Sequence, residues 1–291
     1  MGAKQIVMNT NAEIKETVKE KYAAIANQSK EQNLTSCCGA TACCGDDVYN
    51  LMADDYTTLE GYNADADLGL GCGLPTEFAQ IKEGDTVIDL GSGAGNDAFI
   101  ARRIVGEKGK VLGIDFTEAM INKARTNAEK VRFNNVEFRL GDIEDMPVTS
   151  NFADVIVSNC VLNLVPNKHK VISEIFRVLK PGAHFSISDI VLSGNLPAKW
   201  KEVAELYAGC VSGAIQKVDY LAIIKETGFT NITLQKEKVI VIPDEILANY
   251  LIKDEMEEYK QSDLRILSVT VYADKPAKDE RNCCEPGSSC C

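Results

Sequence analysis

The stretch that decides the fold is VIDLGSGAGNDAF, residues 87–99. Its first residues are mainly apolar and predict a buried strand, and the apolar side chains after the last glycine predict the start of a helix. Gly91, Gly93 and Gly95 lie between them, where glycines let the turn pack tightly and let a ligand approach backbone N–H groups at the helix start. The dinucleotide fingerprint requires a glycine where this chain has Asn96. The stretch therefore predicts a nucleotide-binding turn of another type.

Strands and helices alternate around this turn. Further strands are predicted at 108–116, 136–142, 153–160 and 184–191, and helices at 11–32, 98–105, 118–131 and 168–180, the last ended by Pro181 and Gly182. Such alternation is typical of an α/β fold with a mostly parallel sheet covered on both faces. After residue 195 the order changes, with helices predicted at 197–212, 218–228 and 244–261 and strands at 232–242 and 264–275. We expect these last strands to form an antiparallel C-terminal edge.

Charge and hydropathy exclude several classes of partner. The 291 residues carry a net charge of -12 with a pI near 4.8, which argues against nucleic acid and anionic membranes as partners. No apolar run approaches the ~18 residues of a membrane span, and the first residues lack the apolar centre of a secretion signal. Ile6 stands where the myristoylation pattern needs Ser or Thr. The sequence therefore predicts a cytoplasmic protein.

The eleven cysteines need a chemical explanation, because a cytosolic chain of this size does not need disulfides. Eight of them form the doublets Cys37-Cys38, Cys43-Cys44, Cys283-Cys284 and Cys290-Cys291. Clustered thiolates suit soft metals or metalloids, and a four-thiolate zinc site from two doublets stays open. The single cysteines are Cys72, Cys160 and Cys210. Glycines flank Cys72 on both sides, which predicts an uncrowded sulfur on a mobile loop.

Two aspartates follow the predicted strands in register with the glycine turn. Asp115 ends the second strand, where a carboxylate can accept both ribose hydroxyl protons, and Asp142 follows the third. Taken singly, one could be a helix cap and the other a turn residue. Together with the turn they resemble the Rossmann-like class I methyltransferases, which implies S-adenosylmethionine (SAM) as cofactor. The positions that the resemblance assigns to the cofactor are Asp89, Gly91, Ser92, Gly93, Gly95, Asp115, Phe116, Asp142, Ile143 and Asn159.

Six segments are similar to one branch of that family, the arsenite methyltransferases. They are GLGCGLP (69–75), VIDLGSGAG (87–95), VIVSNCVLNLVP (155–166), RVLKPG (177–182), ISDIV (187–191) and ELYAGCVSGA (205–214), within a resemblance that covers residues 15–235. In that family thiolates on separate segments hold As(III), and the matching catalytic and arsenic-binding positions are Cys72, Cys160 and Cys210. A further family cysteine matches Cys37, with Cys38, Cys43 and Cys44 as competitors. Leu70 replaces a tyrosine of the eukaryotic members.

The resemblance implies methyl transfer from SAM to thiol-bound As(III), in arsenic detoxification, with a small thiol or a thioredoxin-type protein as reductant. Antimony is left open as a second substrate. The arsenic lone pair needs no deprotonation, which agrees with the lack of an evident general base. Two alternatives stay open: a methyltransferase for a small organic acceptor, and a non-catalytic metalloid or zinc binder. The predicted division is an N-terminal helix and cysteine-rich loop (1–60), a SAM-binding domain (61–190), a substrate-binding region (191–275) and a disordered tail (276–291).

Overall fold

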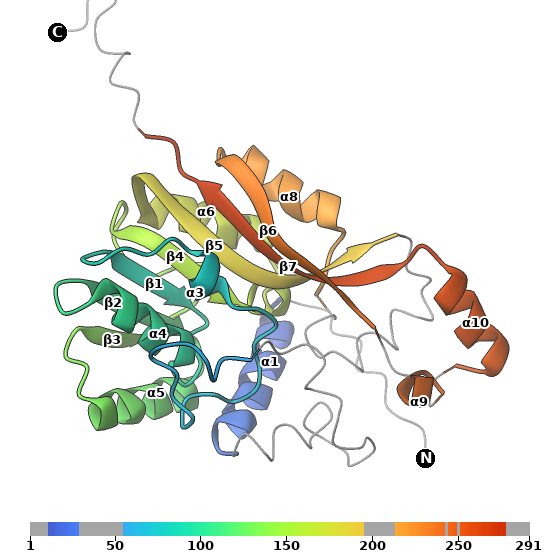
Figure 1. Cartoon of the computed structure of the whole chain (residues 1–291), viewed down its shortest axis with the longest axis horizontal. Helices are drawn as coiled ribbons and strands as arrows, with labels where there is room; N and C mark the ends of the chain where they lie inside the picture. The colour runs from blue at the N-terminus through green and yellow to red at the C-terminus, as the bar shows by residue number, and fades with distance from the viewer. Residues whose placement is uncertain (1–10, 29–54, 195–212, 242–243, 249–250, 278–291) are drawn as a thin grey trace, which may run out of the picture.

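The computed structural model describes residues 11–28, 55–194, 213–241, 244–248 and 251–277. A seven-stranded sheet with the order β3-β2-β1-β4-β5-β7-β6 forms its centre (Figure 1). The helix predicted at 197–212, the cysteine doublets and the tail from residue 278 onward lie outside these residues.

The first five strands of the chain are parallel, as predicted. They are β1 (Thr86–Leu90), β2 (Lys110–Asp115), β3 (Val136–Leu140), β4 (Ala153–Asn159) and β5 (Leu179–Ser193). The last two, β6 (Thr230–Ile240) and β7 (Arg265–Asp274), are antiparallel, and β7 lies between β5 and β6. This confirms the predicted α/β sheet with its antiparallel edge. The strand order reverses between β1 and β4, and ligands of such sheets bind beyond the carboxyl ends at that reversal.

Helices cover both faces of the sheet because alternate strand residues point to opposite sides. On one face Ile88 and Leu90 share an apolar cluster with residues of α6 (Lys168–Val178) and α8 (Lys217–Glu226). On the other face Val87 belongs to a second cluster with residues of α1 (Asn11–Ala26), α4 (Asn96–Val105) and α5 (Glu118–Val131). The short helix η3 (Leu162–Leu164) follows the carboxyl end of β4, and the short helix α3 (Pro75–Phe78) contacts β4, β5 and β7. Among the described residues, no helix combines the length and the apolar character that a bilayer span requires.

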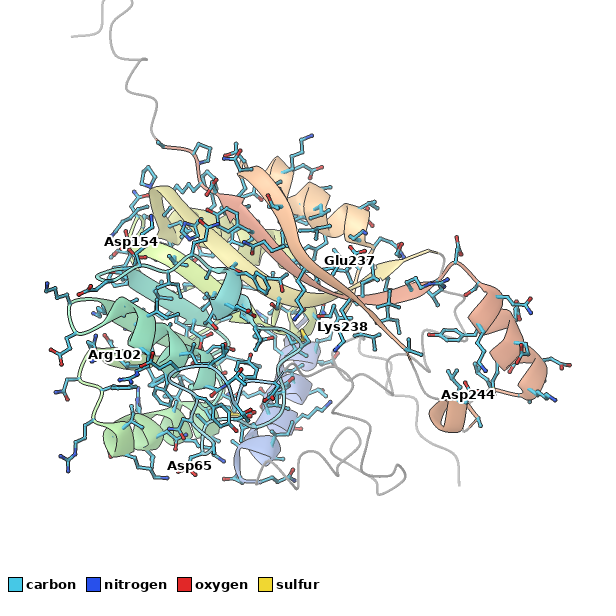
Figure 2. All side chains as sticks on the ribbon, viewed as in Figure 1. Asp65, Arg102, Asp154, Glu237, Lys238 and Asp244 are labelled. Carbon is cyan, nitrogen blue, oxygen red and sulfur yellow. A yellow bond between two sulfur atoms is a disulfide. The ribbon has the colours of Figure 1, made fainter. Side chains whose placement is uncertain are left out.

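The helix predicted at 244–261 is wrong, because the structure has two helices there. They are α9 (Asp244–Leu247) and α10 (Lys253–Gln261), separated at Ile252, whose backbone is extended with φ -75° and ψ 164°. The Glu255 side chain accepts the Ile252 N–H at 3.2 Å and so caps the second helix. Lys260 Nζ binds Asp244 Oδ2 at 2.7 Å, which ties the two helices together at the periphery of the molecule (Figure 2).

Two predicted helix ends also differ. The helix predicted to end at Pro181 and Gly182 ends at Val178, and both residues lie inside β5. Proline lacks the N–H of a strand ladder, and its place here is an irregular one, since the β4–β5 register shifts between Ala153 and Val155. The first helix ends at Ala26 rather than at residue 32.

Candidate active site

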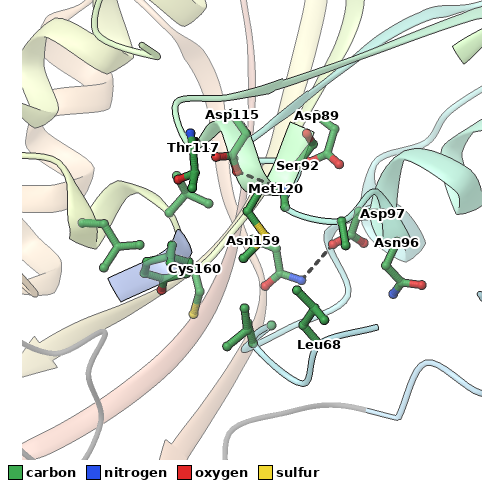
Figure 3. Close-up of a pocket in the computed structure, with 18 of the residues that line it drawn as sticks. Leu68, Asp89, Ser92, Asn96, Asp97, Asp115, Thr117, Met120, Asn159 and Cys160 are labelled. Atoms are coloured by element: carbon green, nitrogen blue, oxygen red, sulfur yellow. Dashed lines mark hydrogen bonds between the residues drawn. The ribbon is translucent and has the colours of Figure 1, made fainter. Parts of the chain in front are cut away.

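A large cavity lies at the carboxyl ends of β1, β2 and β4, with an empty volume of about 1070 Å³ that includes space open to solvent (Figure 3). The glycine turn forms one wall, and Lys15 and Tyr22 of α1 contribute to another. Nine of the ten predicted cofactor residues line it: Asp89, Gly91, Ser92, Gly93, Asp115, Phe116, Asp142, Ile143 and Asn159. The sequence therefore located the cavity, although it did not indicate that α1 would cover it.

The tenth residue, Gly95, does not line the cavity but lies at the end of the glycine turn, directly before α4. Its φ is +100°, in the left-handed region that favours glycine, and it precedes the first residue of α4. A Cβ at this position would lie 2.9 Å from Phe138 Cζ and 3.0 Å from Phe99 Cζ. Gly95 therefore lets the turn pack against two aromatic rings and is not part of the cavity wall formed by Gly91 and Gly93.

Asp115 is fixed at the cavity wall by two backbone N–H groups. Its Oδ1 accepts the Thr117 N–H at 2.8 Å, and its Oδ2 accepts the Gly93 N–H at 3.0 Å. Burial raises the pKa of Asp115, while both of these hydrogen bonds oppose that shift. Each carboxylate oxygen has a further lone pair, so Asp115 can also accept protons from ligand hydroxyls.

Two other carboxyl groups enter the cavity with an oxygen that has no partner among the described residues. They are Asp89, which is 2% exposed, through Oδ2, and Asp97, the second residue of α4, through Oδ1. Burial and the neighbouring Asp97 and Asp115 raise the pKa of Asp89 well above its usual range, and burial raises the pKa of Asp97 to about 6. Ionising these buried carboxyl groups alone is costly. They therefore favour a ligand that brings positive charge and hydrogen-bond donors.

The Asp142 carboxylate is held by a residue that the sequence did not indicate. Lys15 Nζ of α1 lies 2.6 Å from Asp142 Oδ2 and 2.6 Å from Glu144 Oε2. Asp142 Oδ1 accepts the Glu144 N–H at 2.8 Å. No pattern in the sequence around Lys15 indicates this contact, because Asp142 lies 127 residues away.

The structure joins two of the predicted thiols. Cys72 and Cys160 form a disulfide that spans 88 residues of sequence, with 5.8 Å between their Cα atoms. Cys160 lines the cavity, and its N–H donates to the Ser188 carbonyl on β5 at 2.8 Å. Its φ of +58° is unusual for a residue other than glycine. Cys37 and Cys210 lie outside the described residues.

The prediction of an uncrowded Cys72 is wrong. Cys72 is 2% exposed, its N–H donates to Asn159 Oδ1 at 3.0 Å, and its carbonyl accepts from Ser268 Oγ at 2.6 Å. A Cβ on Gly71 would lie 2.8 Å from Asn159 Nδ2, and one on Gly73 would lie 2.5 Å from Ser188 Oγ. Neither glycine has a positive φ. The glycines therefore serve close packing.

Known proteins resemble the chain along most of its length. The methyltransferase domain family matches residues 81–228. The arsenite methyltransferase of Halobacterium salinarum is 37% identical over 284 residues, which cover 92% of this chain and 68% of that protein. The chain belongs to the arsenite methyltransferase family. Another member, from Aquipseudomonas alcaligenes, is 33% identical over 81% of this chain and 68% of its own.

A solved structure supports the same assignment. The crystal structure of an arsenic(III) S-adenosylmethionine methyltransferase from Chlamydomonas reinhardtii superposes with a TM-score of 0.62 at 32% identity, over 79% of this chain and 73% of that one. Membership of the arsenite methyltransferase family and the class I methyltransferase fold were both predicted from the sequence and are confirmed. Within this arsenite methyltransferase, the roles of the individual cysteines and cavity residues remain predictions.

Proposed function

We propose that the chain transfers a methyl group from SAM to trivalent arsenic bound by its own cysteines, as part of arsenic detoxification. One observation carries the proposal: Cys160, bonded to Cys72, lines the same cavity as the glycine turn and Asp115. When bound, SAM supplies a methyl group on a positively charged sulfur. The thiol site and the cofactor cavity therefore meet where transfer would take place.

The cavity fits SAM by charge and by hydrogen bonding. Asp115 is placed for the two ribose hydroxyls, because its oxygens are already oriented by backbone N–H groups. Asp89 and Asp97 offer buried, unpartnered oxygens to the ammonium and the sulfonium charge, and the buried Ser92 Oγ also has no partner among the described residues. We assign Asp142 and Ile143 to the adenine, beside Lys15. A cationic cofactor offsets the cost of ionising these carboxyl groups.

The disulfide must be reduced before its sulfurs can bind arsenic. Reduction adds two electrons and two protons, and a small-molecule thiol or a thioredoxin-type protein supplies them while forming its own disulfide. The two thiols then lie on Cα atoms 5.8 Å apart. Each thiol then displaces one hydroxyl or thiol ligand from As(III), so that an As–S bond replaces an As–O or As–S bond and the thiol proton leaves with the displaced ligand as water or as a free thiol. The bound arsenic keeps its lone pair, so the protein's part is to hold the reacting atoms ~3–3.5 Å apart and in line.

A third thiolate from Cys210 would complete the arsenic site. Three peptide bonds join Cys210 to Gly213, which limits the separation of their Cα atoms to about 11 Å. Gly213 packs directly against the backbone carbonyl of Asn163, only three residues after Cys160. Asn163 is itself anchored, because its Nδ2 donates to the Ile190 carbonyl at 2.9 Å.

Cys37 is our candidate for capturing arsenic first. The thiol-rich composition and the low pI support a cytoplasmic location for the reaction.

The proposal is tested by incubating the reduced chain with SAM, arsenite and excess thiol, and by separating arsenic species by chromatography with mass detection. We expect methylated arsenic from the wild type and from Cys283→Ser in the tail, and none from Cys160→Ser. Calorimetry should show that Cys160→Ser still binds SAM. Undiminished methylation by Cys160→Ser would overturn the assignment of the thiol. SAM binding without any methylated arsenic from the wild type would overturn arsenic as the substrate and point to an organic acceptor.

A further inference from the structure

The Asn159 side chain joins the cofactor cavity to the segment that carries Cys72. Its Oδ1 accepts the Cys72 N–H at 3.0 Å, and its Nδ2 donates to the Gly73 carbonyl at 2.8 Å. The same Nδ2 lies 3.1 Å from Asp97 Oδ2, as the dashed line in Figure 3 shows. The Asn159 amide thus binds the backbone N–H of Cys72 and the backbone carbonyl of Gly73, and it also contacts the Asp97 carboxyl group of the cavity.

Tyr56 contacts the same groups from another part of the chain. Its hydroxyl lies 2.8 Å from the Gly73 carbonyl and 3.2 Å from Asp97 Oδ2, and it accepts a hydrogen bond from Asn159 Nδ2. The ring is 6% exposed and packs with Leu74 and Ile100. Burial, followed by the nearby Asp97, raises the pKa of Tyr56 well above its usual range, so the hydroxyl keeps its proton and remains a donor.

The hydrogen-bond inventory of this group is tight. Tyr56 offers one proton and the Asn159 amide offers two, and they serve the Gly73 carbonyl, Asp97 Oδ2 and the Tyr56 oxygen itself. If Asp97 is protonated, it accepts these bonds poorly and competes as a donor. If it is ionised, it fixes the Tyr56 hydroxyl and the Asn159 amide in one arrangement.

A ligand in the cavity selects between these states. Asp97 Oδ1, its second oxygen, is buried, has no partner among the described residues and belongs to a residue that lines the cavity. A cation there stabilises the ionised carboxylate, whose charge-assisted hydrogen bonds are stronger than neutral ones. The Cys72 segment is held by the same donors, so occupancy of the cavity and the position of this segment are energetically linked.

We propose that Tyr56 is a positioning residue that, through Asn159 and Asp97, couples SAM binding to the placement of Cys72. SAM in the cavity holds residues 71–73 closed against Asn159, and the Tyr56 hydroxyl transmits part of this effect. The inference rests on the proposed function to the extent that SAM occupies the cavity. By thermodynamic reciprocity, fixing the Cys72 segment also strengthens SAM binding.

The test follows the accessibility of two thiols in the reduced, full-length chain. Iodoacetamide is added with and without saturating SAM, and alkylation of Cys72 and Cys160 is quantified by peptide mass spectrometry. Cys72 is buried, so its alkylation rate reports opening of its segment. In the wild type we expect SAM to slow alkylation of Cys72 by about fivefold or more, the lower range of ordinary coupling. In Tyr56→Phe the slowing should be less than about twofold on the same scale.

Two internal references make the result specific. Cys160 lines the cavity and is covered by SAM directly, so its protection should be the same in the wild type and in Tyr56→Phe. Tyr62→Phe removes a hydroxyl from a ring packed against the same apolar cluster and should keep the protection of Cys72. Asp97→Asn provides an independent variant, which keeps the side-chain shape and should lose the protection at saturating SAM.

The outcomes separate the two proposals. Wild-type protection of Cys72 in Tyr56→Phe would overturn the coupling alone, as would SAM binding to the wild type without protection of Cys72. Failure of the wild type to bind SAM in calorimetry would overturn the proposed function, and the coupling with it.

Discussion

Replacing Gly73 with alanine should destabilise the fold because the position has no room for a Cβ. An ideal Cβ would lie 2.5 Å from Ser188 Oγ and 2.7 Å from Ser188 Cβ. Ser188 is 0% exposed in the centre of β5, and its Oγ lies 2.9 Å from Thr270 Oγ1. The Ser188 side chain therefore cannot turn away without losing a buried hydrogen bond. Gly73 has no positive φ, so the cost is steric.

The magnitude follows from overpacking. Forcing one extra methyl group into a packed interior typically costs about 1–3 kcal/mol. For a chain of this size each kcal/mol lowers Tm by roughly 2–4 °C, so Gly73→Ala should melt roughly 2–12 °C below the wild type. Cys72 is the neighbouring residue, so the displacement should also lower the rate of arsenic methylation at a temperature where the variant is still folded.

A double-mutant cycle measures the contact directly. Ser188→Gly removes both atoms that the new methyl group would meet, at its own cost as a glycine within a strand. We expect denaturant unfolding to show that the double variant is more stable than the sum of the two single changes predicts, by about 0.5–3 kcal/mol. Gly84→Ala isolates the other cost of replacing a glycine: its φ is +90° and no atom lies within 4 Å of the position that the alanine Cβ would occupy, so any destabilisation there comes from backbone strain and should show no coupling with Ser188→Gly.

The competing explanation is that the glycines serve mobility. In that case Gly73→Ala would slow the reaction, leave the free energy of unfolding unchanged and show no coupling with Ser188→Gly. Such a result would refute the steric argument and restore the view of a bare, mobile loop.

Two further predictions concern the cavity carboxylates. Asp115→Asn places an NH₂ group against one of the two backbone N–H donors and removes a charge-assisted acceptor. Calorimetry should therefore show that SAM affinity falls about 10- to 100-fold. A change within about twofold would contradict the assignment of Asp115 to the ribose. Burial raises the pKa of Asp97 to about 6 in the folded chain, above the ordinary Asp value of 3.8. The Asp97 contribution to the stability of the ligand-free fold is therefore lost as the pH rises from about 4 to 6. SAM affinity should change in the opposite direction and increase about tenfold between pH 5 and neutrality. An affinity that does not change with pH would contradict the role of Asp97.

The parts of the fold that were predicted correctly are encoded locally. The strand, the glycine turn and Asp115 follow short patterns in which each residue's role depends on its near neighbours. The break at Ile252 was missed because the apolar spacing continues across it, and an extended residue with a capping Glu255 decides against one long helix. Pro181 predicts a helix stop, but the helix ends before it, and the irregular start of β5 accommodates a proline.

The sequence did not indicate the parts of the site that depend on contacts between distant segments. Nothing near Lys15 or Tyr56 in the sequence indicates that they contact residues 127 and 103 positions away, Asp142 and Asn159. The Cys72–Cys160 disulfide was likewise missed, because its geometry is set by the whole sheet.

The C-terminal edge of the sheet is what places the two thiols against each other. The Ser188 carbonyl on β5 binds the Cys160 N–H, while the Ser188 side chain packs against Gly73. On β7, Ser268 Oγ holds the Cys72 carbonyl across 196 residues of sequence. Because β7 is inserted directly beside β5, both thiol-bearing segments rest on adjacent strands of one rigid sheet. The antiparallel edge therefore contributes to the thiol site itself, and Asn159 and Tyr56 then connect that site with the cofactor cavity.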